Sequence, residues 1–250
     1  MDYITLRKEV IDAGLLERQY WFYFYKLMFN VLLLSISVFV LLTVDNFALQ
    51  LLNAVFLAFI VVQFGLVMHD ADHQQVFKSP RNNELLGMIT GSLILNVSSS
   101  AWTEVHNRHH SSPNHVDADP DIEIPGLAYT EEQALGKKGI LKFVAKYQAY
   151  FWLLIMSFSA FSIRLNHHRK VFLAFFVKAE RDRLKHHLSE AILLGMGTSL
   201  YFWLVFSSLG AGKGVVFTIV NYLLTGLYMG TIFATNHKGM PIVNKGGKSD

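Results

Sequence analysis

The sequence predicts an all-α fold: an integral membrane protein with four transmembrane helices in two hairpins and a cytoplasmic helical cap that carries histidine clusters. Three observations carry this prediction. Hydrophobic residues make up 52% of the 250 residues and charged residues only 16%, whereas a soluble domain has about 25% charged residues. The uncharged residues are concentrated in four long runs. Nearly all the positive charges lie on one side of the topology that these runs imply.

The four runs without a charged side chain are each long enough to cross a bilayer. They are residues 27–44, 46–68, 191–212 and 214–236. As helices rising 1.5 Å per residue they reach roughly 27–35 Å, which is the thickness of the hydrocarbon core. Only Asp45 separates the first two runs and only Lys213 separates the last two. Each pair is therefore predicted to form a tight helical hairpin.

The positive charges orient this topology. Of the 22 Lys and Arg residues, four precede the first hairpin, fourteen lie between the hairpins and three follow the second, so Lys213 alone falls in an outer turn. Because cytoplasmic loops are enriched in Lys and Arg, both termini and the insertion 69–190 are predicted to be cytoplasmic, in a bacterial inner membrane rather than the endoplasmic reticulum. The basic pI near 9.0 is then a topology signal and does not indicate nucleic-acid binding.

Two further apolar runs are interpreted as re-entrant or surface-lying helices. Polar residues interrupt the first run, 85–103. If the second run, 147–163, crossed the membrane, it would place the seven positive charges from Arg164 to Lys185 outside, against the charge rule. The chain 1–250 is accordingly expected to be one membrane domain. The aromatic run 20–26 is expected to anchor the first span at the headgroup level.

Two histidine clusters follow the second and precede the third predicted span. His69 and His73 form H-x-x-x-H, and His106, His109 and His110 form H-x-x-H-H. Spacings of three and four place side chains on one helical face, and both clusters face one compartment if the apolar run between them does not cross. Converging imidazoles suit iron, zinc, copper or nickel. Five histidines exceed the needs of one zinc ion, and the zinc-hydrolase pattern H-E-x-x-H is absent, so two iron ions fit better.

These clusters and their surroundings resemble the membrane fatty acid desaturase family. Further motifs that carry the resemblance are Trp102 four residues before His106, Pro113-Asn114, Asp119-Pro120-Asp121-Ile122 and Asn236-His237-Lys238-Gly239-Met240-Pro241. The last of these is similar to the bacterial acyl-lipid and front-end branch. The resemblance covers nearly the whole chain and includes the arrangement in two hairpins.

The resemblance implies an enzyme that uses O2, two electrons and two iron ions to introduce a double bond into a lipid-linked or CoA-linked acyl chain. By analogy the metal ligands are His69, His73, His106, His109, His110 and His237. Asn236 is implied to contribute through water, and Trp102 to line the acyl channel. Asp70 and Asp72 flank ligands and are expected to accept the second ring N–H of neighbouring imidazoles.

One family feature is absent from these 250 residues. The family carries a third cluster, Q-x-x-H-H or H-x-x-H-H, downstream of the second hairpin, and no such cluster follows His237. The chain is therefore expected to be a C-terminally incomplete desaturase. Two alternatives stay open, a di-iron hydroxylase of lipid or alkane and a catalytically inactive membrane remnant that binds lipid.

The electron donor is expected to be a separate protein. The sequence contains neither a His-Pro-Gly-Gly haem motif nor a Gly-rich fingerprint for a flavin or nicotinamide. A ferredoxin, or a separate cytochrome with its reductase, is therefore implied as the electron donor.

The remaining acidic and histidine clusters receive structural interpretations. Asp119 and its acidic neighbours lack the glycine and the glutamate of a calcium loop, so they are expected to orient ligands or cap a helix. The pairs 167–168 and 186–187 are flanked by positive charges. Because those charges disfavour a bound cation, both pairs are expected to contact headgroups or the membrane interface.

Overall fold

The computed structural model describes residues 2–173, 175–178, 188–237 and 240–243, with only the backbone for 234–237. Within these residues every regular element is a helix, apart from one isolated bridge between His115 and Val243. The helices are α1 (Tyr3–Asp12), α2 (Tyr20–Thr43), α3 (Phe47–Asp72), α4 (Pro80–Gly87), the π-helix η1 (Met88–Leu95), α5 (Ser99–Ser111), the 3₁₀ helix η2 (Pro120–Ile122), α6 (Glu131–Gly136), α7 (Gly139–Lys146), α8 (Gln148–Ser157), α9 (Ser159–Leu173) and α11 (Leu188–His237). The predicted all-α class is confirmed.

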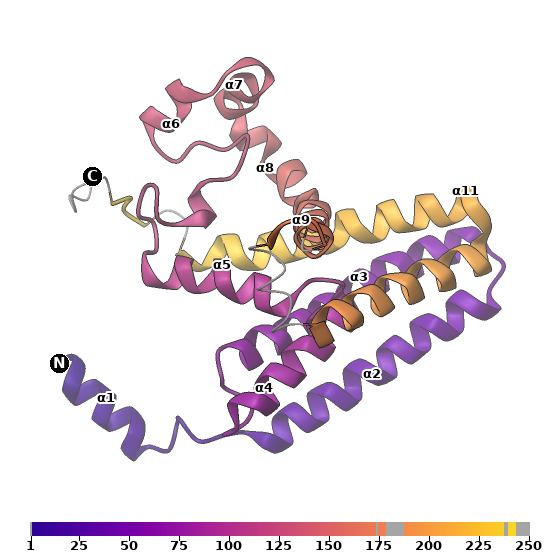
Figure 1. The fold of residues 1–250 in the computed structure, drawn as a ribbon, viewed down its shortest axis with the longest axis horizontal. Coiled ribbons are helices and arrows are strands. Elements are labelled where there is room, and N and C mark those ends of the chain that lie inside the picture. Colours follow the sequence, from indigo (N-terminus) through magenta and orange to yellow (C-terminus); the bar gives the residue numbers. More distant parts are fainter. Residues whose placement is uncertain (1, 174, 179–187, 238–239, 244–250) are drawn as a thin grey trace.

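The first predicted hairpin is formed by α2 and α3, which lie side by side (Figure 1). Its turn is held by polar side chains buried between apolar helices. Gln50 donates to the carbonyl oxygens of Val40 at 2.9 Å and Val44 at 2.7 Å, and Ser37 donates to Asn53 at 2.7 Å. The bond to Val44 satisfies a carbonyl at the end of α2, where the helix supplies no partner.

The second hairpin is the single element α11, which turns back on itself at Gly210. This glycine has φ 71° and ψ 176°, a conformation that is essentially restricted to glycine. The two arms of α11 run back along each other (Figure 1), and Tyr201 on the first arm donates to Asn221 on the second at 3.3 Å. The turn predicted at Lys213 is therefore three residues too late. The charged residue indicates where the chain can leave an apolar layer, whereas the backbone reverses at the glycine that can adopt a positive φ.

The two hairpins pack into one bundle of four long apolar arms within the described residues. Asn221 on α11 donates to the carbonyl oxygen of Ala54 on α3 at 3.1 Å. By length and composition, α2, α3 and α11 are each able to cross a membrane, and up to five spans result if each bent helix pair is counted as one.

The apolar run 85–103 does not form one straight helix. It passes through α4 and η1 into α5 with a bend of 109°, and Asn96 makes the reversal in the left-handed region at φ 59°. Leu95 is fully buried against Gly65 of α3, and a Cβ at Gly197 of α11 would collide with the carbonyl oxygen of Leu93. Part of the insertion 69–190 therefore penetrates between the hairpins, which agrees with the re-entrant alternative predicted for this run.

The run 147–163 is also broken, by a bend of 50° between α8 and α9. The α9 helix packs along α11, where Ser159 donates to the carbonyl oxygen of Gly226 at 3.2 Å. The guanidinium of Arg164 is fully enclosed, donates to the carbonyl oxygen of Leu95 at 3.2 Å and lies 4.2 Å from the ring centre of Tyr222.

The expected interfacial role of His167 and His168 is wrong. His167 is 7% exposed, and its Nδ1 accepts the backbone N–H of Ser98 at 3.0 Å. His168 lies 2.8 Å from both the carbonyl oxygen of Arg164 and the hydroxyl of Thr198. The two imidazoles connect α9 to Ser98 and to Thr198 of α11. The neighbouring positive charges in the sequence indicate an interfacial position instead. The pair His186-His187 lies outside the described residues.

Candidate metal centre

Four imidazoles from two helices face one small volume. His69 and His73 stand at the end of α3, and the bend before α5 brings His106 and His110 opposite them. Nε2 of His106 lies 3.0 Å from Nε2 of His73 and 2.9 Å from Nε2 of His110. His69, His73 and His106 each present a ring nitrogen within 4.8 Å of the other two. The two clusters that the sequence predicts to share one site are therefore adjacent.

Three of these imidazoles, His73, His106 and His110, have lowered pKa values, which favour the neutral form. Burial, followed by the neighbouring imidazoles, lowers the pKa of His106 to about 3. Burial and the same neighbours also lower the pKa values of His73 and His110 below the usual range. A neutral imidazole keeps a free lone pair, which is the form that binds a metal.

His109 is turned toward a carboxylate. Its Nδ1 lies 2.8 Å from Asp119, and both side chains are buried. Asp119 also accepts backbone N–H groups from Asn114 at 2.7 Å and Asp121 at 2.8 Å. Although burial raises the pKa of Asp119, the hydrogen bonds from His109 and the two backbone groups outweigh it and hold this pKa below its ordinary value.

The contact with Asp119 fixes the orientation of the His109 ring, as carboxylate partners do for metal-binding imidazoles. Asp119 thus has both roles expected for it, because it caps the N-terminus of η2 and contacts the imidazole of His109. His109, Asp119 and Asp121 also form a second group whose possible ligand atoms lie within 4.8 Å of one another.

Asp70 makes the contact expected of it. One carboxylate oxygen lies 3.3 Å from Nδ1 of His69, and the other accepts the hydroxyl of Tyr23 at 3.1 Å. Tyr23 belongs to the aromatic run expected to be an interfacial anchor, and it is buried whereas Trp21 is 70% exposed. The sequence does contain a signal for Tyr23. Tyr23, Asn30 and Ser37 recur every seven residues, and all three are buried on the face of α2 toward α3.

Asp72 makes a contact different from the expected one. It accepts the hydroxyl of Ser99, the first residue of α5, at 2.7 Å, and no imidazole N–H contacts it among the described interactions. Glu190, at the start of α11, accepts the hydroxyls of Ser98 and Ser100 and the backbone N–H of Ser100. Two carboxylates thus hold the N-terminal turn of α5, where the helix dipole favours negative charge. Sequence reasoning missed Glu190, because nothing local links it to the serine run.

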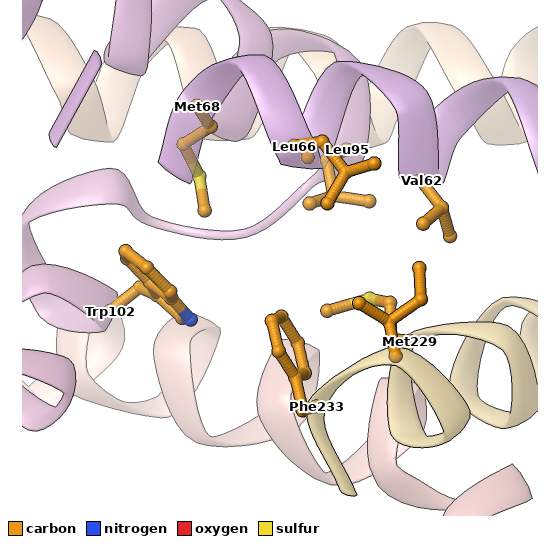
Figure 2. A pocket seen from close by; sticks show the side chains of 9 residues that line it. Val62, Leu66, Met68, Leu95, Trp102, Met229 and Phe233 are labelled. Atoms are coloured by element: carbon orange, nitrogen blue, oxygen red, sulfur yellow. The ribbon is translucent and has the colours of Figure 1, made fainter. Parts of the chain in front are cut away.

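Trp102 separates the histidines from an apolar pocket. Its ring stacks on His106 with centroids 4.0 Å apart and planes 25° apart, and it meets His69 edge-on at 5.5 Å. On its other side it faces the pocket between α3, η1 and α11 (Figure 2). The pocket is lined by Val62, Gly65, Leu66, Met68, Leu95, Trp102, Met229, Ile232 and Phe233. An apolar chain in this pocket would meet Trp102 next to the imidazoles.

The comparison with known proteins accounts for this combination of sites. The sequence matches the family described as fatty acid desaturase over residues 46–248. The chain belongs to the fatty acid desaturase family. It is 28% identical to the acyl-lipid (9-3)-desaturase of Physcomitrium patens over 97% of this chain, and 30% identical to the Delta(8)-fatty-acid desaturase of Euglena gracilis over 62% of it. It is 23% identical to the Delta(5) fatty acid desaturase fat-4 of Caenorhabditis elegans over 94% of its length.

These desaturases are longer proteins. The matched segments cover 46%, 36% and 52% of the three relatives, so the chain spans about half of their length or less. No solved structure matches the chain.

Two residues expected at a desaturase centre are only partly described. Asn236 and His237 form the last turn of α11, and the structure describes their backbone but not their side chains. Phe233, one turn earlier, lines the pocket. The last turn of α11, which carries Asn236 and His237, therefore directly follows the turn that lines the apolar pocket.

Proposed function

We propose that this protein is an acyl desaturase that introduces a C=C bond into a lipid-linked or CoA-linked acyl chain with O2 and two electrons. One observation carries the proposal. Trp102 stacks on His106, one of the converging imidazoles, and also lines an apolar pocket. The names of the relatives, which are acyl-lipid, Delta(8), Delta(6) and Delta(5) desaturases, support the same reaction.

We propose that two iron ions occupy the centre. The donor set fits iron, because neutral imidazoles converge from two helices and imidazole is a ligand that iron accepts. The proposed ligands are His69, His73, His106, His109, His110 and His237. Iron with O2 supplies an oxidant able to attack an unactivated methylene, which offers no acidic proton to a base and no electrophile to a nucleophile.

The chain's own residues bind and place the substrate. Each methylene that enters the pocket is stabilised by about 0.8 kcal/mol relative to water. Trp102 gives the acyl chain a rigid wall beside His106, which places one segment of the chain next to the centre. Asp70 and Asp119 contact Nδ1 of His69 and His109 and would orient these rings toward the centre.

We further propose that α2, α3 and the two arms of α11 cross the membrane, with both termini and the histidine centre on the cytoplasmic side of a bacterial inner membrane. The one-sided distribution of Lys and Arg supports this orientation. A ferredoxin, or a cytochrome with its reductase, would deliver electrons from that side.

The test is to purify the chain from a bacterial host in detergent, measure iron by mass spectrometry, and assay the host lipids for new double bonds. These 250 residues carry no third histidine cluster, so we expect them to bind iron weakly and to form no unsaturated product. A C-terminal extension that bears a Q-x-x-H-H cluster should restore both, and His106→Ala in the extended chain should abolish both. The matched control is His115→Ala, a histidine outside the converging group. An extended chain without iron and without product would refute the proposal, and a hydroxylated acyl chain would assign the same centre to a hydroxylase.

A further inference from the structure

The pair α7 and α8 forms an arm that projects from the bundle (Figure 1). The arm consists of residues 137–158, and its inner end packs closely against α11. A Cβ at Gly226 of α11 would collide with the carbonyl oxygen of Ser157, and a Cβ at Gly230 would lie 2.8 Å from the side chain of Met156. Such close backbone approach fixes α8 against the second arm of α11, so the outer part of the arm has a defined position.

The outer part of the arm presents large apolar side chains on its surface. Ile140 is 72% exposed, Phe143 51% and Tyr150 85%, and Leu153 and Leu154 are both more than half exposed. Ile140 and Phe143 are three apart and lie on one face of α7. A contiguous apolar surface of this kind marks an interaction site.

The same segment carries four lysines within ten residues, at positions 137, 138, 142 and 146. Lys142 and Lys146 are four apart and share a face of α7 that adjoins the face of Phe143. None of the four takes part in an ion pair with the residues that the structure describes. Lys146 lies 5.2 Å from the ring centre of Tyr147. The arm thus combines exposed apolar side chains with four lysines, and residues 137–158 contain no Asp or Glu to neutralise them.

We propose that the α7–α8 arm binds the surface of an anionic bilayer. Ile140 and Phe143 enter the boundary between headgroups and acyl chains, while the lysines extend toward lipid phosphates. A helix with an apolar face and lysines on the adjoining face lies in the membrane interface in this way. Figure 1 shows α8 leaving the bundle at a steep angle to the arms of α11, so the arm runs across the direction of the candidate spans.

An acidic electron-donor protein is the other anionic partner that lysines fit. The apolar side chains favour lipid, because Ile140, Tyr150 and Leu154 would remain in water beside a partner held by charge alone. The same arm is anchored on α11, a helix apolar and long enough to cross a membrane. The lipid surface is therefore the occupant we assign.

The experiment uses the absence of cysteine from the chain. Phe143→Cys is labelled with an environment-sensitive fluorophore and placed in nanodiscs of phosphatidylcholine with or without phosphatidylglycerol. We expect quenching by lipid-borne nitroxide and protection from iodide, both stronger with phosphatidylglycerol. The control Glu132→Cys on α6 should stay accessible to iodide in both lipids. Equal iodide quenching of the two labels in both kinds of nanodisc would overturn the proposal.

The lysines are tested by charge reversal in the labelled protein. Lys142→Glu should weaken the phosphatidylglycerol-dependent part of membrane binding by more than about fivefold, because loss of one basic residue near an anionic surface alone costs about that factor and the glutamate adds repulsion. Lys213→Glu, at the opposite end of the bundle, should leave it unchanged. If Lys142→Glu instead lowers the affinity for an acidic ferredoxin while the label at position 143 stays exposed to water, the arm is a protein-docking surface and the lipid assignment is wrong.

Discussion

Ser100 donates its backbone N–H to a carboxylate oxygen of Glu190 at 2.9 Å, although 90 residues of sequence separate them. The hydroxyls of Ser98 and Ser100 donate to the same carboxylate, and Glu190 is only 3% exposed. This contact joins the first turn of α5 to the first turn of α11. It therefore fixes the helix that carries Trp102 and the second histidine cluster.

Replacing Glu190 should loosen that helix. Glu190→Ala leaves buried serine donors without an acceptor, which costs about 1–3 kcal/mol. For a chain of this size each kcal/mol lowers Tm by roughly 2–4 °C. We expect a lower Tm in detergent and reduced iron content. Glu104→Ala on the exposed side of α5 removes a 3.9 Å surface ion pair with Lys170, and loss of an exposed ion pair costs less than about 1 kcal/mol. Equal effects of the two variants would contradict this role of Glu190.

Asp119 should control metal affinity through His109. Asp119→Asn keeps the shape of the side chain but weakens the hydrogen bond that orients the imidazole, and loss of such a partner lowers metal affinity by about 10–100-fold. Iron retained after dialysis against a graded chelator measures the change. Asp121→Asn, whose carboxylate lies 3.8 Å from His109, should have the smaller effect. The reverse order would show that Asp121 is the orienting group.

Gly65 should limit the length of acyl chain that the pocket accepts. It lines the pocket, and a Cβ there would lie 3.1 Å from Leu95. Gly65→Leu should lower kcat/KM for the longest accepted chain by about fourfold for each methylene excluded, with the iron content unchanged. Chromatography of the products from a mixture of chain lengths measures the shift. Gly195→Leu, where a Cβ would meet nothing within 4 Å, is the control and should keep the original preference.

The metal-free protein should lose stability in weak acid. The pKa of His106 is about 3 in the folded protein and about 6.5 in an unfolded chain. Between these values the unfolded state binds a proton that the folded state does not, so stability falls as pH falls below about 6.5. Chelator-treated protein should therefore have a lower Tm at pH 5 than at pH 7.5. The decrease should be smaller in His106→Gln, and an identical decrease would exclude His106 as its source.

The parts of the fold that depend on local pattern could be predicted from the sequence. Uncharged runs predict the two hairpins, and spacings of three and four predict which imidazoles share a face. The predicted turn at Lys213 lies three residues after the actual reversal at Gly210, because hydropathy does not depend on backbone conformation. The polar residues in the run 85–103 predict a re-entrant or surface-lying helix, and its penetration between α3 and α11 depends on distant glycines such as Gly197.

The supporting residues of the site were harder to predict. Asp70 and Asp119 lie near ligands in sequence and could be anticipated. Tyr23 and Glu190 reach the site from 46 and 90 residues away, counted to His69 and Ser100, and their own neighbours in sequence indicate only an aromatic belt and a helix start. A buried polar contact between distant segments becomes visible only when the fold brings the two segments together.

The stacking of Trp102 on His106 couples the two halves of the site mechanically. The rings are four residues apart on one helix and 4.0 Å apart in space, so α5 cannot shift one without shifting the other. A guest in the pocket would contact the indole, and a displaced indole would shift His106. If the imidazoles bind metal as proposed, filling of the pocket would then change the position of one ligand, which would let an enzyme delay its most reactive state until a substrate is present.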